Sequence, residues 1–148
     1  TFVNRSLTLI HEEIFGKEKH LTRQKREDFI EIFYQLLILK CIELIGPDSL
    51  SFTCKDGIDT GAAALASFFS ILQIINGEMD EESDFLRWIL YTPALFIRER
   101  GIDPERLSRT LSSLETFDNA LKEKSSKLLK ALGSLYGSRF LQSLKVRH

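Results

Sequence analysis

Cysteine chemistry on phosphate esters is the reaction that residue types and spacing in this sequence suggest. Cys54 ends the alternating segment SLSFTC and precedes the turn KDGID and the alanine-rich run GAAALASFF. A thiol is ionised at neutral pH when backbone N–H groups and a helix N-terminus surround it with positive potential. Those amides can also hold phosphoryl oxygens, while a bidentate guanidinium clamps them in the transition state. A strand, a cysteine, a five-residue loop, an arginine and a helix would together meet these needs.

The segment from Cys54 to Gly61, Cys-Lys-Asp-Gly-Ile-Asp-Thr-Gly, resembles the catalytic loop of the cysteine-dependent phosphoinositide phosphatases, which carry Cys-x5-Arg. Myotubularin-type enzymes carry Cys-Ser-Asp-Gly-Trp-Asp-Arg-Thr, and Sac-type enzymes carry Cys-x-x-Cys-x-Asp-Arg-Thr. Bacterial secreted inositol phosphatases carry Cys-Lys-Ser-Gly-Lys-Asp-Arg-Thr. The resemblance covers about eight residues and the helical run that follows them.

Carried over by position, the resemblance implies that Cys54 is the nucleophile. Asp56 falls on the loop aspartate proposed as the general acid in the myotubularin group. Lys55 falls on the lysine that helps to hold inositol-ring phosphates in the bacterial group. The phosphate-binding residues implied by the resemblance are Lys55, Gly57, Ile58, Asp59, Thr60 and Gly61.

Thr60 stands where these families have the catalytic arginine. The nearest basic residue is Lys55, and the arginines at positions 87, 98 and 100 lie far along the chain. Losing one preorganised donor to a developing oxyanion costs roughly 10²–10³ in rate. Asp56 and Asp59 would also repel a phosphate dianion and raise the pKa of Cys54. We therefore expect a degenerate, catalytically inactive domain that acts by binding a phosphorylated ligand or a protein, as a bacterial secreted effector or a regulatory pseudoenzyme.

Two other interpretations stay open. In the first, KDGID is an ordinary turn by composition and Cys54 is a small buried residue. The chain is then a helical protein-interaction module without enzymatic ancestry, which holds a partner in an apolar groove. In the second, the chain is an active cysteine phosphatase whose arginine is supplied from elsewhere.

Composition limits the class of protein. The chain has 148 residues, of which 43% are hydrophobic and 28% are charged, as in one soluble globular domain. A net charge of -1 gives no general attraction to nucleic acid. Charged residues interrupt the longest apolar run, 29–45, so we expect no membrane span. The three histidines show no ligand spacing, so we expect no metal or cofactor.

Cysteine usage bears on the compartment. Cys41 lies in an apolar helical run and Cys54 in a polar turn, and their spacing forms no disulfide framework. We expect two free thiols in a reducing compartment, either the cytoplasm or, for a secreted effector, a host cytosol.

The elements that must position the loop are mainly helices. Patterns predict a mainly α fold, a bundle of about six helices with at most one short strand, at 49–54. Thr22 is predicted to cap a helix, and Pro93 and Thr116 are predicted to be helix boundaries. The predicted helical segments are 6–15, 23–45, 60–76, 84–92, 104–115, 117–132 and 134–146.

A lone strand leaves its backbone N–H and C=O groups unpaired. The single domain 1–148 is therefore either the C-terminal part of a larger protein, or 49–54 is an extended connector within a helical bundle. Helix 23–45 is apolar on nearly every side, which predicts a central position. Trp88, with Phe85, Leu86 and Ile89, is predicted to belong to the core.

Overall fold

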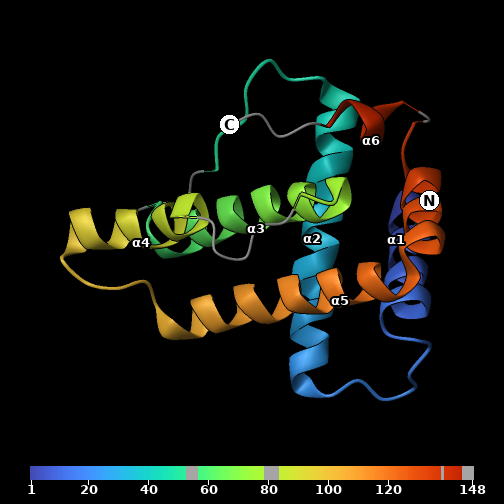
Figure 1. The fold of residues 1–148 in the computed structure, drawn as a ribbon, viewed down its shortest axis with the longest axis horizontal. Coiled ribbons are helices and arrows are strands. Elements are labelled where there is room, and N and C mark those ends of the chain that lie inside the picture. The colour runs from blue at the N-terminus through green and yellow to red at the C-terminus, as the bar shows by residue number, and fades with distance from the viewer. Residues whose placement is uncertain (53–56, 79–83, 138, 145–148) are drawn as a thin grey trace.

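The computed structural model describes residues 1–52, 57–78, 84–137 and 139–144, and it confirms the mainly α class (Figure 1). No β-strand occurs in these ranges, and residues 49–52 have no regular secondary structure. Cys54 and the end of the predicted strand lie outside the described residues. The helical elements are α1 (Phe2–Leu9), the π-helical segment η1 (Ile10–Ile14), α2 (Arg23–Ile45), α3 (Asp59–Asn76), α4 (Asp84–Arg98), α5 (Pro104–Leu135) and α6 (Phe140–Ser143).

Several predicted helix boundaries are confirmed by their capping contacts. Thr22 Oγ1 accepts the backbone N–H of Lys25 at 3.3 Å, so it caps α2 as the sequence predicts. Gly46 ends α2 in the left-handed conformation, with φ +59°. Asp103 Oδ1 accepts the N–H of Arg106 at 2.8 Å and so caps α5.

The predicted boundary at Pro93 is wrong, because α4 continues through it to Arg98. A proline inside a helix removes one backbone hydrogen bond. Leu86, Leu90 and Ala94 are all buried and lie four residues apart, so they form one continuous apolar stripe. Burial of that stripe, with α4 packed mainly against α3, outweighs the missing hydrogen bond.

The predicted boundary at Thr116 is also wrong, because α5 (Pro104–Leu135) passes through Thr116 without a break. Thr116 Oγ1 donates to Asp28 Oδ2 at 3.2 Å instead of capping a new helix. The interruption lies eight residues later, at Lys124, whose φ of -130° and ψ of 34° are not helical. Lys124 Nζ donates to the carbonyl oxygen of Glu13 at 2.9 Å, which ties this kink to η1. The predicted helix cap at Ser83 lies outside the described residues.

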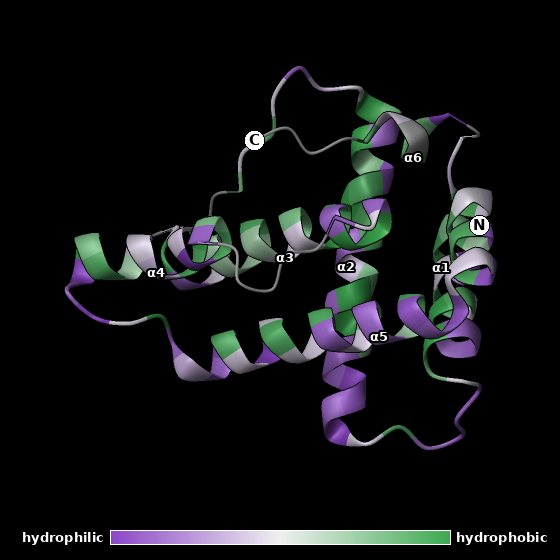
Figure 2. Cartoon of the chain, in the orientation of Figure 1, coloured by the Kyte–Doolittle hydropathy of each residue, from purple (hydrophilic) through white to green (hydrophobic). Residues whose placement is uncertain are grey.

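The main core lies where α2 meets α5, α3 and the α1–η1 segment (Figure 1). Ile32, Leu36 and Leu39 of α2 are fully buried, and Phe117 of α5 is fully buried against the same cluster. Figure 2 shows α2 changing from hydrophilic in its first turns to more hydrophobic further along. The predicted central position of this helix is therefore confirmed for its middle turns.

The last turn of α2 departs from that prediction. Leu44 and Ile45 are each 74% exposed, and Cys41 is an exposed free cysteine. The buried α2 residues of the core cluster, Ile32, Leu36 and Leu39, all lie in the turns before the last one. No helix in the described part of the chain combines the length and the apolar character needed to cross a membrane.

Two leucines of α2 provide a matched test of this core. Replacing Leu36, which is fully buried, by alanine is expected to lower the free energy of unfolding by about 3 kcal/mol, because it removes buried methyl groups and leaves a cavity. Leu44→Ala changes an exposed leucine of the same helix, and we expect a change within about 0.5 kcal/mol. Urea denaturation followed by circular dichroism measures both values, and equal losses would contradict this core.

Candidate functional site

The predicted catalytic loop is only partly described. Cys54, Lys55 and Asp56 lie outside the described residues, so the predicted nucleophile, general acid and lysine stay predictions. Gly57 has φ +64°, a left-handed conformation that glycine adopts without strain. Ile58 is only 3% exposed, so its side chain packs into the protein rather than facing a ligand.

Asp59, the first residue of α3, is held by a bidentate contact with Arg100. Arg100 Nη1 donates to Asp59 Oδ1 at 3.0 Å, and Nη2 donates to Oδ2 at 2.7 Å. The backbone N–H of Asp103 donates to the same Oδ1 at 2.9 Å. This carboxylate therefore joins the start of α3 to the segment that connects α4 with α5.

The Asp59 contact also brings an arginine close to the predicted loop. Arg100 lies 41 residues along the chain from Asp59, yet its guanidinium reaches the start of α3. A guanidinium is thus adjacent to the predicted loop in space, contrary to its distance in the sequence. Its bonds to the carboxylate, helped by the Asp103 N–H and opposed by burial, lower the pKa of Asp59 from 3.8 to about 2.

Thr60, where the phosphatase families have arginine, is exposed and borders two hollows. The first has a volume of about 630 Å³ and is also lined by Asp59, Arg100 and Arg106. The second has a volume of about 350 Å³ and lies among α2, α3 and α5. Gly61 and the two alanines after it are buried, so small side chains bring this end of α3 close to its neighbours.

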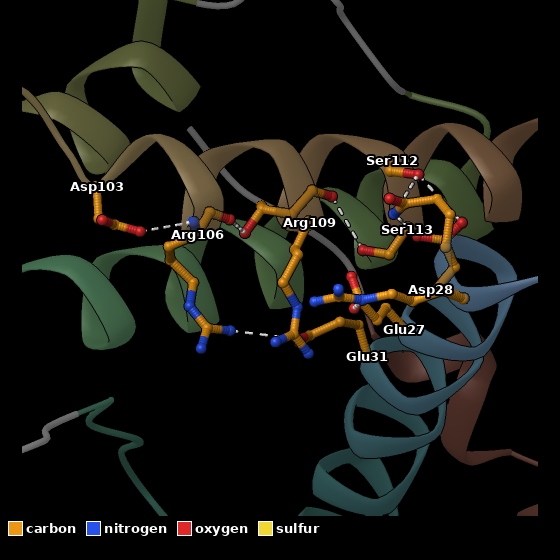
Figure 3. Close-up of polar contacts among 11 residues, drawn as sticks. Glu27, Asp28, Glu31, Asp103, Arg106, Arg109, Ser112 and Ser113 are labelled. Atoms are coloured by element: carbon orange, nitrogen blue, oxygen red, sulfur yellow. Dashed lines mark hydrogen bonds and ion pairs between the residues drawn. The ribbon is translucent and has the colours of Figure 1, made fainter.

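The second hollow contains a pair of arginines on one carboxylate (Figure 3). Arg106 Nη1 and Arg109 Nη2 both donate to Glu31 Oε1, at 3.2 and 2.8 Å. The Nε of Arg109 is buried and has no hydrogen-bond partner among the described residues, and neither has the Oε1 of Gln35, a residue only 4% exposed. The lining residues thus include a donor and an acceptor that are unused, both of them buried atoms, and Glu31 balances one of the two arginine charges.

A buried carboxylate next to this hollow fixes α5 on α2. Asp28 is 3% exposed and accepts hydrogen bonds from Gln24 Nε2 at 3.1 Å, Ser112 Oγ at 3.1 Å and Thr116 Oγ1 at 3.2 Å. A buried carboxylate is tolerated when hydrogen bonds satisfy its oxygens. Figure 3 shows that Asp28 and Glu31 of α2 lie on the side of α5 that carries Arg109 and Ser112. These contacts set the register of the two helices.

No metal site is formed by the described residues: they include no group of three or more His, Cys, Asp or Glu side chains placed to hold an ion.

A different surface, on α4, was missed at the sequence level. We call it the α4 face, and it consists of five exposed apolar side chains: Phe85 (52% exposed), Trp88 (71%), Tyr91 (43%), Leu95 (57%) and Phe96 (80%). Spacings of three and four residues place them on one side of the helix, opposite the stripe buried against α3.

The prediction that Trp88 belongs to the core is therefore wrong, and so is the same prediction for Phe85. Leu86 and Leu90 occupy the face of α4 that packs inward, which leaves Trp88 on the outer side. The Phe85 ring does contact Phe69 of α3, with centroids 4.9 Å apart, so it anchors the edge of the α4 face. The signal was present in the sequence, because apolar residues at 85, 88, 91, 95 and 96 form a second stripe beside 86, 90 and 94.

Comparison with known proteins found no match to a family model, to a curated protein or to a solved structure. The features of the fold that bear on function are the Asp59–Arg100 contact, the hollows beside Thr60 and the α4 face.

The Asp59 contact predicts a pH-dependent contribution to stability. Because its folded pKa is lowered from 3.8 to about 2, its contribution is present above about pH 4 and is lost as the pH falls towards 2. Asp59→Asn is expected to lose about 1 kcal/mol at pH 7, a modest value because Arg100 is half exposed to solvent. The gap from the wild type should close between pH 4 and 2.

Thermal unfolding of both proteins across this pH range measures the gap. Asp48→Asn, in the exposed connection after α2, is the matched control, and we expect it to show no such gap at pH 7. A gap for Asp59→Asn that persists at pH 2 would contradict the assigned contact.

Proposed function

We propose that this chain is a helical protein-interaction module that binds its partner through the α4 face. The observation that carries the proposal is the exposure of Trp88 (71%) and Phe96 (80%) within one stripe of large apolar side chains. Contiguous exposed apolar patches of more than a few hundred Å² are rare on monomeric proteins and mark interaction sites. Tryptophan and tyrosine are also enriched among the residues that dominate binding energy.

The α4 face is held in place by the interior of the protein. Leu86, Leu90 and Ala94 are buried on the opposite side of α4, and the Phe85 ring packs on Phe69. Arg100, just after α4, is fixed by Asp59. A surface that is already ordered loses less conformational entropy when a partner binds.

Position-specific photo-crosslinking tests this function. Benzoylphenylalanine at position 88 is expected to form discrete adducts after irradiation of the cells that naturally make the protein. The same group at position 44 is the matched control, because Leu44 is as exposed (74%) but lies outside the α4 face. The readout is the mass of the adducts on a denaturing gel. Equal labelling from both positions, or none from position 88, would overturn the proposal.

A second candidate function is the phosphatase-like one: a catalytically inactive domain that binds a phosphorylated ligand beside Thr60, as a pseudoenzyme or secreted effector would. Two observations favour it. Arg100 brings a guanidinium, bonded to Asp59, to the start of α3, and Arg109 Nε and Gln35 Oε1 have no partner among the described residues. A guanidinium and a free amide oxygen suit a ligand that carries both phosphate and hydroxyl groups.

Isothermal titration with myo-inositol hexakisphosphate, and separately with inorganic phosphate, tests this second function. Thr60→Arg is expected to tighten binding at least about tenfold, because it adds a guanidinium at the start of α3. Arg100→Ala is expected to weaken binding by a similar factor, whereas Arg87→Ala, an exposed arginine on α4, should leave it unchanged. If neither the wild type nor Thr60→Arg binds either probe, the phosphate-binding function is wrong.

A further inference from the structure

We propose that a hollow beside Trp88 takes a tryptophan side chain of the partner protein, whose indole N–H donates to the backbone C=O of Ile89. The inference rests on the proposed interaction function and names the chemistry of the partner. We call this place the Pro93 hollow. It has a volume of about 330 Å³, and its lining includes Phe52, Leu65, Trp88, Ile89, Thr92 and Pro93. Trp88 belongs both to this hollow and to the α4 face, so the hollow borders that face.

Small residues of α3 leave the space that forms the Pro93 hollow. Gly61 and Ala62, in the first turn of the helix, line it and are buried. Larger side chains at these positions would fill part of the gap between α3 and α4. Phe52 forms a wall, and its ring packs against that of Phe68 on α3, with centroids 5.2 Å apart. Because these parts are already held in place, an occupant loses little free energy in ordering them.

Pro93 leaves a backbone acceptor at this hollow. In an α-helix the C=O of residue 89 points along the axis toward residue 93 and accepts the N–H there. Proline has no N–H, so the C=O of Ile89 lacks its helical donor. Ile89 and Pro93 both line the hollow, so this oxygen lies between two residues of its lining. An occupant that covered the oxygen without a donor would leave it unsatisfied, which is unfavourable.

The charges of the lining select the occupant. None of the described residues that line the Pro93 hollow is charged, so a charged side chain would lose its hydration there without gaining a counter-charge. An aliphatic or phenylalanine side chain would fill the space but would bring no donor to the Ile89 oxygen. Indole meets both requirements, because it is a large apolar ring with one N–H donor and no acceptor. Its partially positive N–H complements the partially negative carbonyl oxygen.

Trp88 adds a second reason for an aromatic occupant. Its side chain is 71% exposed and lines the hollow, so an indole placed there lies within reach of its ring. Offset-stacked and edge-to-face aromatic pairs are favourable beyond the apolar area that they bury. Tryptophan is also enriched among the residues that dominate the binding energy of interfaces.

Two small probes that differ in the donor test the hollow on the isolated protein. Indole carries the N–H, and benzothiophene is a ring of the same shape with sulfur in place of the N–H. Backbone amide shifts in isotope-labelled protein, followed by NMR as each probe is added, give the two dissociation constants. We expect the wild type to bind indole at about millimolar concentration, as suits so small a ligand.

Pro93→Ala supplies the missing N–H to the C=O of Ile89 and so removes the acceptor. We expect this variant to bind indole about fivefold more weakly than the wild type does, because one hydrogen bond is lost, and to bind benzothiophene within about twofold of the wild type. Alanine is the better helix former, so the variant keeps α4, which circular dichroism verifies. Equal weakening of both probes, or no weakening of indole, would overturn the hydrogen bond to Ile89.

Two aromatic residues of the α4 face locate the probes. Trp88→Ala should weaken both probes at least about threefold, because it removes a wall of the Pro93 hollow. Phe96→Ala is the matched control, because Phe96 is similarly exposed (80%) but is not among the residues that line the hollow. Both probes should bind this control as they bind the wild type. Equal effects of the two variants would overturn the assignment of the hollow.

The partner is tested in the cells that naturally make the protein. Benzoylphenylalanine is placed at position 96, outside the hollow, and Pro93→Ala should lower the yield of its adducts at least about threefold. If the probes behave as expected but the yield is unchanged, the partner's tryptophan is wrong and the interaction function stands. If no position on the α4 face gives adducts, the interaction function fails and the partner's tryptophan fails with it, whereas the probes still decide whether the hollow binds indole.

Discussion

The contact between Asp59 and Arg100 is the constraint on which the arrangement of α3, α4 and the start of α5 depends. It bonds the first residue of α3 to the connection between α4 and α5, with both carboxylate oxygens engaged. Helix α4 packs mainly against α3. The Asp59–Arg100 contact fixes the start of α3 relative to the end of α4, and it therefore helps to determine which side of α4 faces solvent. The same contact occupies the guanidinium nearest to the predicted catalytic loop. One ion pair thus supports the orientation of α4 and balances the charge beside Thr60.

Polar contacts play a comparable role between α2 and α5. Leucine and phenylalanine side chains supply most of the buried surface there, but apolar contacts alone allow helices to slide or rotate. Asp28, bonded to Ser112 and Thr116, and Glu31, bonded to Arg106 and Arg109, have specific partners that only one register satisfies. Burying a carboxylate that lost these partners would be unfavourable, so alternative registers are disfavoured.

Local signals in the sequence predicted the elements well. Thr22, Gly46 and Asp103 act through neighbours a few residues away, so their effects can be predicted from short stretches. Pro93 and Thr116 failed as boundaries because packing and a side-chain bond to Asp28, 88 residues away, override the local preference. The contact between Arg100 and Asp59 could not be predicted for a similar reason, because the residues next to each of them in the sequence carry no information about the other partner. The exposure of Trp88 depends on which of two apolar stripes α3 covers, and that choice is a property of the whole fold.

Helix α1 packs against the C-terminal part of α5. Arg5 of α1 bonds to the carbonyl oxygen of Ser134, 129 residues later, and α1 lies beside the C-terminal end of α5 (Figure 1). On the ribosome, α1 therefore emerges long before the surface that it packs against. The α1–η1 segment also packs against α2, so only the part of its apolar side that α5 covers stays exposed until α5 is made, and contacts of such long sequence separation form slowly. The packing of the N-terminal helix is therefore completed only after α5 has been synthesised.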